Sequence, residues 1–589
     1  MEKKQNQFLL EEASQWVQIW ANFLLQPPFS FSQNNSYSLK MIEEILAASE
    51  QGNSCIEKKE IQIHELSDLF LNEKEIKKSQ VAPFIYNEKY LYLYRYWQLE
   101  QSLAEQIIRV MNNKIQPIDD IYRLNLLQDE HQKQALEQVA KNGLTIITGG
   151  PGTGKTYTLA RIIAVLQKAM PNIRVAMAAP TGKAAQRMKD ALQNSFTDEN
   201  LQQKLSIQEI EKLKQLTPIT LHRLLGLGQY STQAKYNKNQ PLPYDVVVVD
   251  EASMLDLSLA NMLFSAVDEQ TRLILLGDAQ QLASVNVGNV LADLQATSIL
   301  DHNKIQLVTS RRFKEGALIG KLAKFIQQPD LKNEPQTLVQ FQEQVTQVTN
   351  LRKIKLAEEM SDVVQIEYLQ KDQIKREKYY NILMDGFLDY VEILKVYLQS
   401  EEIENYLKQI VKIFDHYRIL TAVKHGEFGL FTLNMQIEKR LLAELNLVKS
   451  GDWYIGRPVM MTYNDYQLGL SNGDIGICLK RNFNENSPFE VYFPSLEKWV
   501  IATRLPKNVE TAYALTIHKS QGSEFTHTAV VLDSAAENLL SKELIYTAVT
   551  RAKSVVSLLV DAQTFLQALT VKTTRKSGLV SKINQMNIK

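Results

Sequence analysis

The first residues in this chain whose types and spacing could do chemistry lie in the stretch "TIITGGPGTGKTYTLARII", residues 145–163. Its glycines, lysine and threonine fit the pattern GxxxxGK followed by Ser or Thr: Gly149, Gly154, Lys155 and Thr156. In such a loop, backbone N–H groups and the N-terminus of the next helix hold phosphates, Lys155 contacts the β- and γ-phosphates, and Thr156 binds magnesium. The stretch predicts a nucleotide triphosphate site, which by itself would suit a kinase, a switch, a pump or a motor.

Acidic and amide side chains downstream are placed to act beside this loop. Asp250 and Glu251 follow four valines in "VVVVDEAS". The first acid can bind magnesium, and the second can orient and deprotonate the attacking water. Adjacent acids after a strand are often only a solvated loop, but after a phosphate-binding loop hydrolysis is the favoured interpretation. In "LLGDAQQLASV", Asp278 and Gln281 end another apolar run, where a side chain could sense the γ-phosphate; alone, this could also be a turn.

Two arginines could stabilise the charge of a phosphoryl transition state. They are Arg312 in "TSRRF" and Arg551 in "IYTAVTRAK". Arg551 belongs to a second region of alternating strands and helices, so its reaching the γ-phosphate would place the nucleotide between two domains. Ligand contacts that differ between open and closed states shift their populations. This arrangement is typical of a motor.

The elements that must position these residues alternate between apolar strands and helices, starting near residue 126. Four runs follow this pattern: "LTIIT" (144–148), "RVAMAAP" (174–180), "DVVVVDEA" (245–252) and "RLILLGD" (272–278). Strands that are apolar on both faces indicate a parallel sheet covered by helices. A second α/β domain begins near 413. Short strands around Asn472-Gly473, a strong hairpin signal, predict a small β-barrel inserted in it.

The sequence predicts an α/β protein with five parts, of which the first is helical. The aromatic cluster at 89–108 indicates a buried helix or strand face rather than a base-stacking platform. The charged segment 327–412 is typical of a solvated helical insertion without chemistry. The predicted parts are an N-terminal helical partner-docking domain (1–125), a first motor domain (126–326), the insertion (327–412), a second motor domain (413–450 and 508–575) and the β-barrel (451–507).

Composition limits the classes that remain. With 589 residues the chain is too long for one core. Its 66 basic and 66 acidic residues cancel, so any basic path for a nucleic acid must be local. Two cysteines, Cys55 and Cys478, cannot build a four-cysteine metal site. No apolar run has the length of a signal peptide or membrane span, so a cytoplasmic protein that does not enter membranes is expected.

Nine stretches match one family in order and spacing. They are "QDEHQKQAL", "GGPGTGKT", "AAPTGKAAQRM", "ITLHRLLG", "VVVVDEASM", "LLGDAQQLASV", "TSRRF", "YALTIHKSQGSEF" and "LIYTAVTRAK". Together they resemble the successive motifs of superfamily 1 DNA helicases. Three more stretches, "RILTAVKHGEFG", "GRPVMMTYNDYQLGLSNGDIG" and "LYLYRYWQLE", resemble the RecD type, the α subunit of exodeoxyribonuclease V. The resemblance extends from about residue 85 to 560.

The resemblance implies two RecA-like P-loop motor domains with an SH3-like β-barrel insertion, using ATP and Mg²⁺ to move 5′ to 3′ on single-stranded DNA. It implies nucleotide contacts by Gln132, which reads adenine, and by Gly149, Gly150, Pro151, Gly152, Thr153, Gly154, Lys155 and Thr156. The implied catalytic residues are Lys155, Asp250, Glu251, Gln281 (the γ-phosphate sensor), Arg312 and Arg551, with Thr156 and Asp250 on the metal. Arg311 is the alternative to Arg312.

The resemblance also implies DNA contacts in three groups of residues, whose hydroxyl, imidazole and ammonium groups suit the DNA backbone rather than the bases. The groups are Pro180, Thr181 and Lys183; Thr220, His222 and Arg223; and Thr516, His518, Lys519 and Gln521. Outside these motifs, a lone histidine is better explained as a buried imidazole.

The favoured hypothesis is a helicase and translocase that forms a heterotrimer with the β and γ subunits of exodeoxyribonuclease V. Its DNA would be single-stranded or the end of a duplex. A free-standing RecD-like repair helicase and an ATP-switched scaffold subunit are the alternatives. A metal-dependent nuclease needs several converging carboxylates, and the sequence offers no spaced acidic set outside the ATP motifs. Nuclease activity is therefore expected to reside in a partner.

Overall fold

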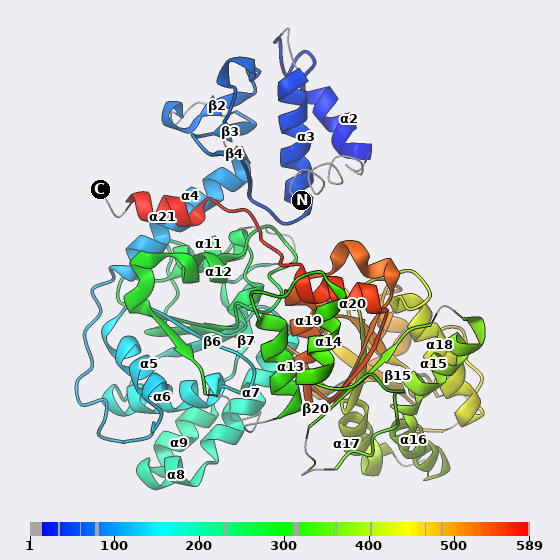
Figure 1. Cartoon of the computed structure of the whole chain (residues 1–589). Helices are drawn as coiled ribbons and strands as arrows, with labels where there is room; N and C mark the ends of the chain where they lie inside the picture. The colour runs from blue at the N-terminus through cyan, green and yellow to red at the C-terminus, as the bar shows by residue number, and fades with distance from the viewer. Residues whose placement is uncertain are drawn as a thin grey trace.

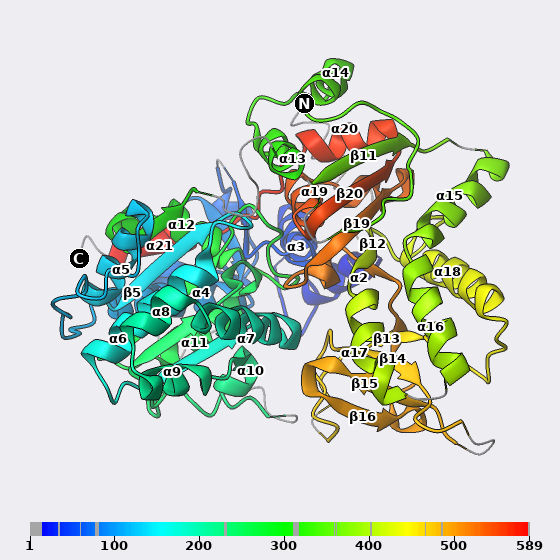
Figure 2. The same cartoon turned by 90° about the horizontal axis from the view of Figure 1, so that it is seen from below.

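The computed structural model of the chain shows a smaller N-terminal lobe above two α/β lobes that lie side by side (Figure 1). Seen from below, the first and second lobes face each other, with a small β unit beneath the second (Figure 2). None of the helices described is long and apolar enough to cross a bilayer. The structure describes residues 15–32, 36–58, 60–76, 82–228, 233–309, 317–357, 360, 362–370, 372–400, 403–465, 467–483 and 487–586.

The first lobe is built on a six-stranded sheet in the order β10-β5-β9-β8-β6-β7, with all recorded pairs parallel. Three central strands are buried along their whole length, as expected for apolar strands covered on both faces. The strands are β5 (Leu144–Gly149), β6 (Val175–Ala179), β7 (Ile219–Thr220), β8 (Val246–Val249), β9 (Arg272–Gly277) and β10 (Lys304–Leu307). The helices are α5 (Glu130–Lys141), α6 (Lys155–Ala169), α7 (Gly182–Phe196), α8 (Glu199–Lys204), α9 (Ile207–Lys214), α10 (Leu221–Leu224), α11 (Leu257–Ala266) and α12 (Val290–Ala296).

The second lobe has a five-stranded parallel sheet in the order β11-β20-β19-β12-β18. Both predicted α/β units are thus confirmed as parallel sheets. The strands are β11 (Val363–Tyr368), β12 (Tyr417–Thr421), β18 (Ala514–Thr516), β19 (Phe525–Leu532) and β20 (Ala552–Val560). The helices are α13 (Leu318–Gln327), α14 (Pro335–Gln344), α15 (Gln373–Asp385), α16 (Leu388–Ser400), α17 (Ile403–Phe414), α18 (Leu430–Leu445), α19 (Lys542–Val549) and α20 (Ala562–Thr570).

One strand of this sheet corrects the interpretation of 327–412 as a purely helical insertion. β11 lies within that segment and pairs in register with β20, from Val363 opposite Val555 to Tyr368 opposite Val560. A six-residue edge strand between charged helices leaves too short an apolar run to be recognised from sequence. The segment therefore completes the second sheet in addition to contributing helices.

A five-stranded antiparallel sheet lies where the sequence predicts a β-barrel, in the order β16-β15-β14-β13-β17. The recorded pairs join neighbours along this order, and the described residues show no pair between β16 and β17. The small β unit is observed, while its closure as an SH3-like barrel stays a prediction. The strands are β13 (Pro458–Met460), β14 (Ile475–Leu479), β15 (Glu490–Phe493), β16 (Lys498–Ile501) and β17 (Glu510–Thr511).

The N-terminal lobe contains strands that the prediction of a helical domain missed. A four-stranded sheet in the order β1-β4-β3-β2 accompanies its helices. These strands have only three or four residues each, which is too short for an alternating pattern to be recognised. The elements are α2 (Gln15–Leu24), α3 (Ser36–Glu50), β1 (Cys55–Glu57), β2 (Phe70–Asn72), β3 (Phe84–Tyr86), β4 (Tyr90–Leu93) and α4 (Tyr94–Met111).

The C-terminal segment returns to the N-terminal lobe, where α21 (Leu579–Met586) packs against α4. The centre of this junction is Glu100 of α4, whose side chain is fully buried. Its carboxylate accepts hydrogen bonds from Ser54, Ser577 and the backbone N–H of Gly578, and it pairs with Lys582 at 2.9 Å. Helix α4 and the C-terminal helix α21 are thus joined around one buried ion pair.

Replacing Lys582 with Met should weaken this junction, because it leaves the Glu100 carboxylate buried without a counter-charge. Breaking one side of a buried pair costs about 3–5 kcal/mol. We expect the urea transition of the N-terminal lobe to move to lower concentration and protease cleavage between the lobes to accelerate. Lys576→Met, which removes a half-exposed pair with Glu57, should cost less than about 1 kcal/mol. Equal effects of the two variants would contradict this account.

Candidate active site

The phosphate-binding loop connects β5 to α6 and needs glycine at two positions. Gly152 and Gly154 have φ of 75° and 80°, in the left-handed region that residues with a side chain seldom adopt. Gly154 is the residue before α6, so the amide groups of the first helical turn face the space enclosed by the loop. A Cβ on Gly149 would lie 2.5 Å from the hydroxyl of Thr153. The loop has the tight curvature and the helix N-terminus that bind an anion.

Lys155 lies across this loop. Its ammonium donates to the carbonyl oxygens of Gly149 at 2.6 Å and Gly150 at 3.2 Å, contacts that phosphate oxygens would replace. Nearby, Gln132 is buried, and its side-chain oxygen has no hydrogen-bond partner among the described residues. A Cβ on Gly154 would lie 3.6 Å from the Gln132 amide nitrogen, so this amide adjoins the loop. The unpaired amide and the loop together fit a nucleotide.

The two predicted acids follow β8 directly. Burial, and then the adjacent Glu251 carboxylate, raise the pKa of Asp250 to about 6, against the opposing charge of Lys155. The Asp250 carboxylate accepts a hydrogen bond from the Glu251 N–H at 2.8 Å. Glu251 has a φ of 52°, an uncommon conformation for a residue with a side chain. Two acids thus crowd one side of the loop, where a cation would relieve their repulsion.

The residues that follow β9 join the two lobes. Burial raises the pKa of Asp278, and its carboxylate accepts hydrogen bonds from Gln281 at 3.3 Å and from the Tyr546 hydroxyl of the second lobe at 3.0 Å. The side-chain oxygen of Gln281 is buried without a hydrogen-bond partner in the described structure. One residue on, the Leu282 N–H donates to the Thr547 hydroxyl at 2.8 Å. The predicted sensor therefore lies at the contact between the lobes.

Arg551 reaches the same place from the second lobe. It is buried, which lowers its pKa, and the carboxylate of Glu251 opposes this effect. Its guanidinium donates to the carbonyl oxygens of Thr547 at 3.1 Å and Ser523 at 3.2 Å. A cavity of about 630 Å³ is lined by residues 151–156, by Asp250, Glu251 and Gln281, and by Arg551. Arg312, with its alternative Arg311, lies outside the described residues.

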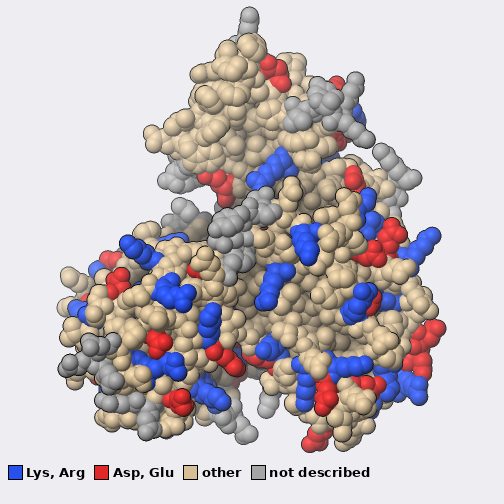
Figure 3. All heavy atoms as spheres, turned by 180° about the vertical axis from the view of Figure 1, so that it is seen from behind, with Lys and Arg blue, Asp and Glu red and all other residues tan. Residues whose placement is uncertain are grey.

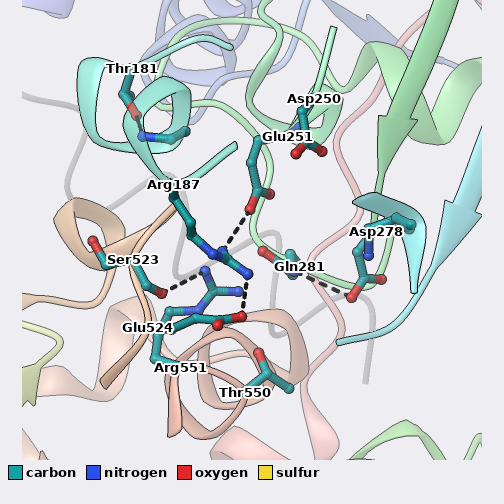
Figure 4. Close-up of polar contacts among 12 residues, drawn as sticks. Thr181, Arg187, Asp250, Glu251, Asp278, Gln281, Ser523, Glu524, Thr550 and Arg551 are labelled. Atoms are coloured by element: carbon teal, nitrogen blue, oxygen red, sulfur yellow. Dashed lines mark hydrogen bonds and ion pairs between the residues drawn. The ribbon is translucent and has the colours of Figure 1, made fainter. Parts of the chain in front are cut away.

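Sequence reasoning missed Arg187, which lies on α7 at the centre of this group (Figure 4). Its guanidinium pairs with Glu251 at 3.4 Å and, through its other terminal nitrogen, with Glu524 of the second lobe. From sequence, an arginine in a polar helix is normally interpreted as a side chain that points into solvent. The partner lies 337 residues further along the chain, so only the fold brings the two together.

The first predicted group of DNA contacts lies beside the cavity. Pro180 follows β6, and the Thr181 hydroxyl accepts a hydrogen bond from the Ala184 N–H at the start of α7. Lys183 lines the cavity, with its ammonium 5.0 Å from the centre of the Phe525 ring. Burial lowers the pKa of Lys183 to about 8, with Asp415 opposing.

The second group lies on a short helix of the first lobe. The Thr220 hydroxyl accepts from the Arg223 N–H where α10 begins, and the Arg223 side chain is exposed. Burial lowers the pKa of His222. On the back of the molecule, Lys and Arg are mixed with Asp and Glu (Figure 3).

The third group follows β18 in the second lobe. Thr516 is buried and accepts a hydrogen bond from the Lys519 N–H at 3.3 Å, and the Lys519 ammonium pairs with Glu510 at 3.2 Å. Burial lowers the pKa of His518. Gln521 is also buried, and its side-chain amide donates to the Leu282 carbonyl of the first lobe at 2.7 Å. Its described contact joins the lobes.

Two known families match the parts of the chain that form the cavity. An AAA domain matches residues 132–287, and a UvrD-like helicase C-terminal domain matches 511–559. The first match includes the phosphate-binding loop and both acids, and the second includes Arg551. With two parallel sheets around one cavity, these matches define a P-loop ATPase of the helicase class.

Similar proteins specify the family within this class. The RecBCD enzyme subunit RecD of Haemophilus influenzae is 33% identical over 554 residues, covering 86% of this chain and 82% of the relative. RecD of Mycolicibacterium smegmatis is 34% identical, covering 85% and 83%. The ATP-dependent RecD2 DNA helicase of Deinococcus radiodurans is 28% identical, covering 72% and 48%. This chain belongs to the RecD family of RecBCD enzyme subunits. A solved structure of Bacteroides Pif1 bound to ssDNA, at 16% identity over 76% of this chain and a TM-score of 0.40, is too distant to add to this.

Replacing Lys155 with Gln should weaken nucleotide binding, because it removes the cation that lies across the loop. Charge-assisted hydrogen bonds contribute about 1.5–3 kcal/mol, so the dissociation constant of a fluorescent ATP analogue should rise about 10- to 100-fold. Lys168→Gln is the matched control, because Lys168 is on the same helix and pairs with Glu209 away from the cavity. Unchanged affinity in Lys155→Gln would show that the nucleotide binds elsewhere.

Proposed function

We propose that this chain is an ATP-dependent DNA helicase that serves as the α subunit of a RecBCD-type exodeoxyribonuclease V and moves 5′ to 3′ on single-stranded DNA. The observation that carries this proposal is the cavity lined by both lobes, in a chain of the RecD family. A ligand that contacts both walls changes how tightly they close. ATP binding and hydrolysis can therefore move one lobe against the other.

The first wall binds and orients the nucleotide. Lys155 and the amides of residues 149–156 hold the phosphates, and Gln132 contacts the base. Thr156 and Asp250 hold Mg²⁺, which supplies positive charge to the phosphate oxygens when bound. Burial and the adjacent Glu251 carboxylate raise the pKa of Asp250, which fits a carboxylate that has a cation as its partner.

The site is complete when the cleft closes and Arg551 of the second wall joins Glu251 and Gln281 of the first wall. Glu251 orients the attacking water and accepts its proton, and Gln281 contacts the γ-phosphate. Arg551 stabilises negative charge that develops on the transferred phosphoryl group, and Arg312 is proposed to do the same. Because Arg551 and Gln281 come from different lobes, the complete set exists only in the closed arrangement.

We propose that translocation arises from the positions of the predicted DNA contacts. The groups at 180–183 and 220–223 belong to the first lobe, and the group at 516–521 belongs to the second. Relative motion of the lobes therefore changes the distance between the DNA-contact groups of the first lobe and the DNA-contact group of the second lobe. We propose that the chain works in the cytoplasm on single strands and duplex ends, with the β and γ subunits as partners and nuclease activity residing in a partner.

Two other functions are separable from this one. A free-standing helicase is less favoured, because RecD of Haemophilus influenzae matches more of this chain, at higher identity, than RecD2 of Deinococcus radiodurans does. Recovery of two larger helicase-nuclease partners from native extract would distinguish the subunit from the free-standing form. A scaffold that uses ATP only as an assembly switch would not need both Glu251 and Arg551 in the cavity. An unaltered chain that binds ATP but shows no DNA-stimulated ATP turnover would favour the scaffold.

The proposed polarity predicts which duplexes the chain opens. With ATP, a fluorescent duplex carrying a 5′ single-stranded tail should be unwound, and the same duplex with a 3′ tail should not.

Glu251→Gln should slow unwinding and ATP turnover by about 100-fold or more, because it removes the base that accepts the proton, while DNA and ATP still bind. Unwinding from 3′ tails alone would contradict the polarity, and unwinding by Glu251→Gln at the normal rate would contradict the assignment of Glu251.

A further inference from the structure

Arg187 pairs with Glu251, the carboxylate proposed to activate water, and is not among the residues that the sequence predicts to bind nucleotide. One terminal nitrogen pairs with Glu251 of the first lobe at 3.4 Å, and the other pairs with Glu524 of the second lobe. The side chains of Glu251 and Glu524 are only 14% and 10% exposed, so both carboxylates are held in a poorly solvated space. Arg187 lines the same cavity as the phosphate-binding loop. It is therefore a bridge between the lobes within the candidate site.

The charges around Arg187 favour its place between the carboxylates. Burial alone would lower the pKa of Arg187, but the carboxylates of Glu524, Glu251 and Asp250 outweigh this and raise it. A planar guanidinium can bond two carboxylates at once, which an ammonium group does less well. Without Arg187, two acids from opposite lobes would share the cleft without this cation between them.

The bridge continues to the arginine of the second lobe. Ser523, the neighbour of Glu524, accepts a hydrogen bond from the Arg551 guanidinium at 3.2 Å. Figure 4 shows Glu251, Arg187, Glu524 and Arg551 in sequence across the cleft. The residue that orients water and the residue that stabilises phosphoryl charge are thus connected through Arg187. Any movement of the second lobe that carries Glu524 away removes one anchor of Arg187.

We propose that Arg187 is a positioning residue for ATP hydrolysis: anchored by Glu524 when the cleft is closed, it fixes the carboxylate of Glu251 for water activation. Opening the cleft separates Arg187 from Glu524 and releases Glu251 from this position. ATP hydrolysis is then limited to the closed arrangement of the lobes. This limit reduces ATP hydrolysis that is not coupled to movement along DNA. This inference rests on the proposed function, since it assigns a role within the same hydrolytic site.

The test compares single and double variants of the full chain. Arg187→Gln, Glu524→Gln and the double variant remove the bridge from either side, and Arg187→Lys keeps the charge without the planar fork. Arg174→Gln is the matched control, because Arg174 pairs with Asp245 at 2.8 Å on an exposed surface of the first lobe. For each protein, kcat and KM of DNA-stimulated ATP turnover, the affinity for a fluorescent ATP analogue, and the thermal midpoint would be measured.

Misplacement of a catalytic group by about 1 Å can cost about 100-fold in rate. We expect Arg187→Gln to lower kcat about 10- to 100-fold, with KM and analogue affinity within about twofold of the unaltered chain. Glu524→Gln should lower kcat less, by about three- to tenfold, and the double variant should be no slower than Arg187→Gln, as expected for residues acting as one unit. Arg187→Lys should recover part of the rate, and Arg174→Gln should match the unaltered chain.

Three results would overturn the inference. The first is a kcat within about twofold of normal in Arg187→Gln. The second is a double variant slowed by the product of the two single effects. The third is a loss of kcat accompanied by an equal loss of analogue affinity and a lower thermal midpoint, which would indicate a role in folding. A stable, unaltered chain that binds ATP but shows no DNA-stimulated turnover would instead overturn the proposed function, and the role of Arg187 with it.

Discussion

The hydrogen bonds that join the two lobes at residues 278–282 are the contact on which the rest of the arrangement depends. The Tyr546 hydroxyl donates to Asp278, and the Gln521 amide donates to the Leu282 carbonyl. Both bonds tie the second lobe to the short segment that carries the predicted γ-phosphate sensor. The cavity has its second wall because the lobes meet here. Small changes at this contact would therefore alter the opening of the nucleotide site. The same changes would alter the distance between the predicted DNA-contact groups of the two lobes.

This arrangement places charged side chains in a poorly solvated cleft, which is energetically unfavourable for each charge on its own. Burial raises the pKa of Asp250 and Asp278 and lowers that of Arg551. Removing one partner of a buried pair costs about 3–5 kcal/mol, a large share of the 5–15 kcal/mol that stabilises a typical protein. Such a site is favourable only while opposite charges face each other, as they do at Arg187. Under the proposed function, a closed cleft filled by a nucleotide and a cation would satisfy this condition, and an open cleft would not.

Much of the fold and of the site could be predicted because the relevant signals are local. The phosphate-binding loop and the two acids follow apolar strands, and the ends of parallel strands lie at one edge of a sheet. The features that could not be predicted from the sequence are short strands and contacts between residues that lie far apart in the chain. The N-terminal strands have only three or four residues each, and β11 is interrupted by Gln365 and Glu367, so neither shows a clear apolar pattern. The contacts of Arg187 and Glu100 join residues hundreds of positions apart. The position of Arg312 and the closure of the small β unit stay predictions.

The central claim is that nucleotide state changes how closely the two lobes approach, and the distance between them tests it most directly. Fluorophores on exposed positions of each lobe, Gln202→Cys and Lys439→Cys, can report this distance, because the natural cysteines Cys55 and Cys478 are buried. With single-stranded DNA present, the account predicts a shorter distance with a non-hydrolysable ATP analogue than with ADP or no nucleotide. A distance that is the same in all three states would contradict it.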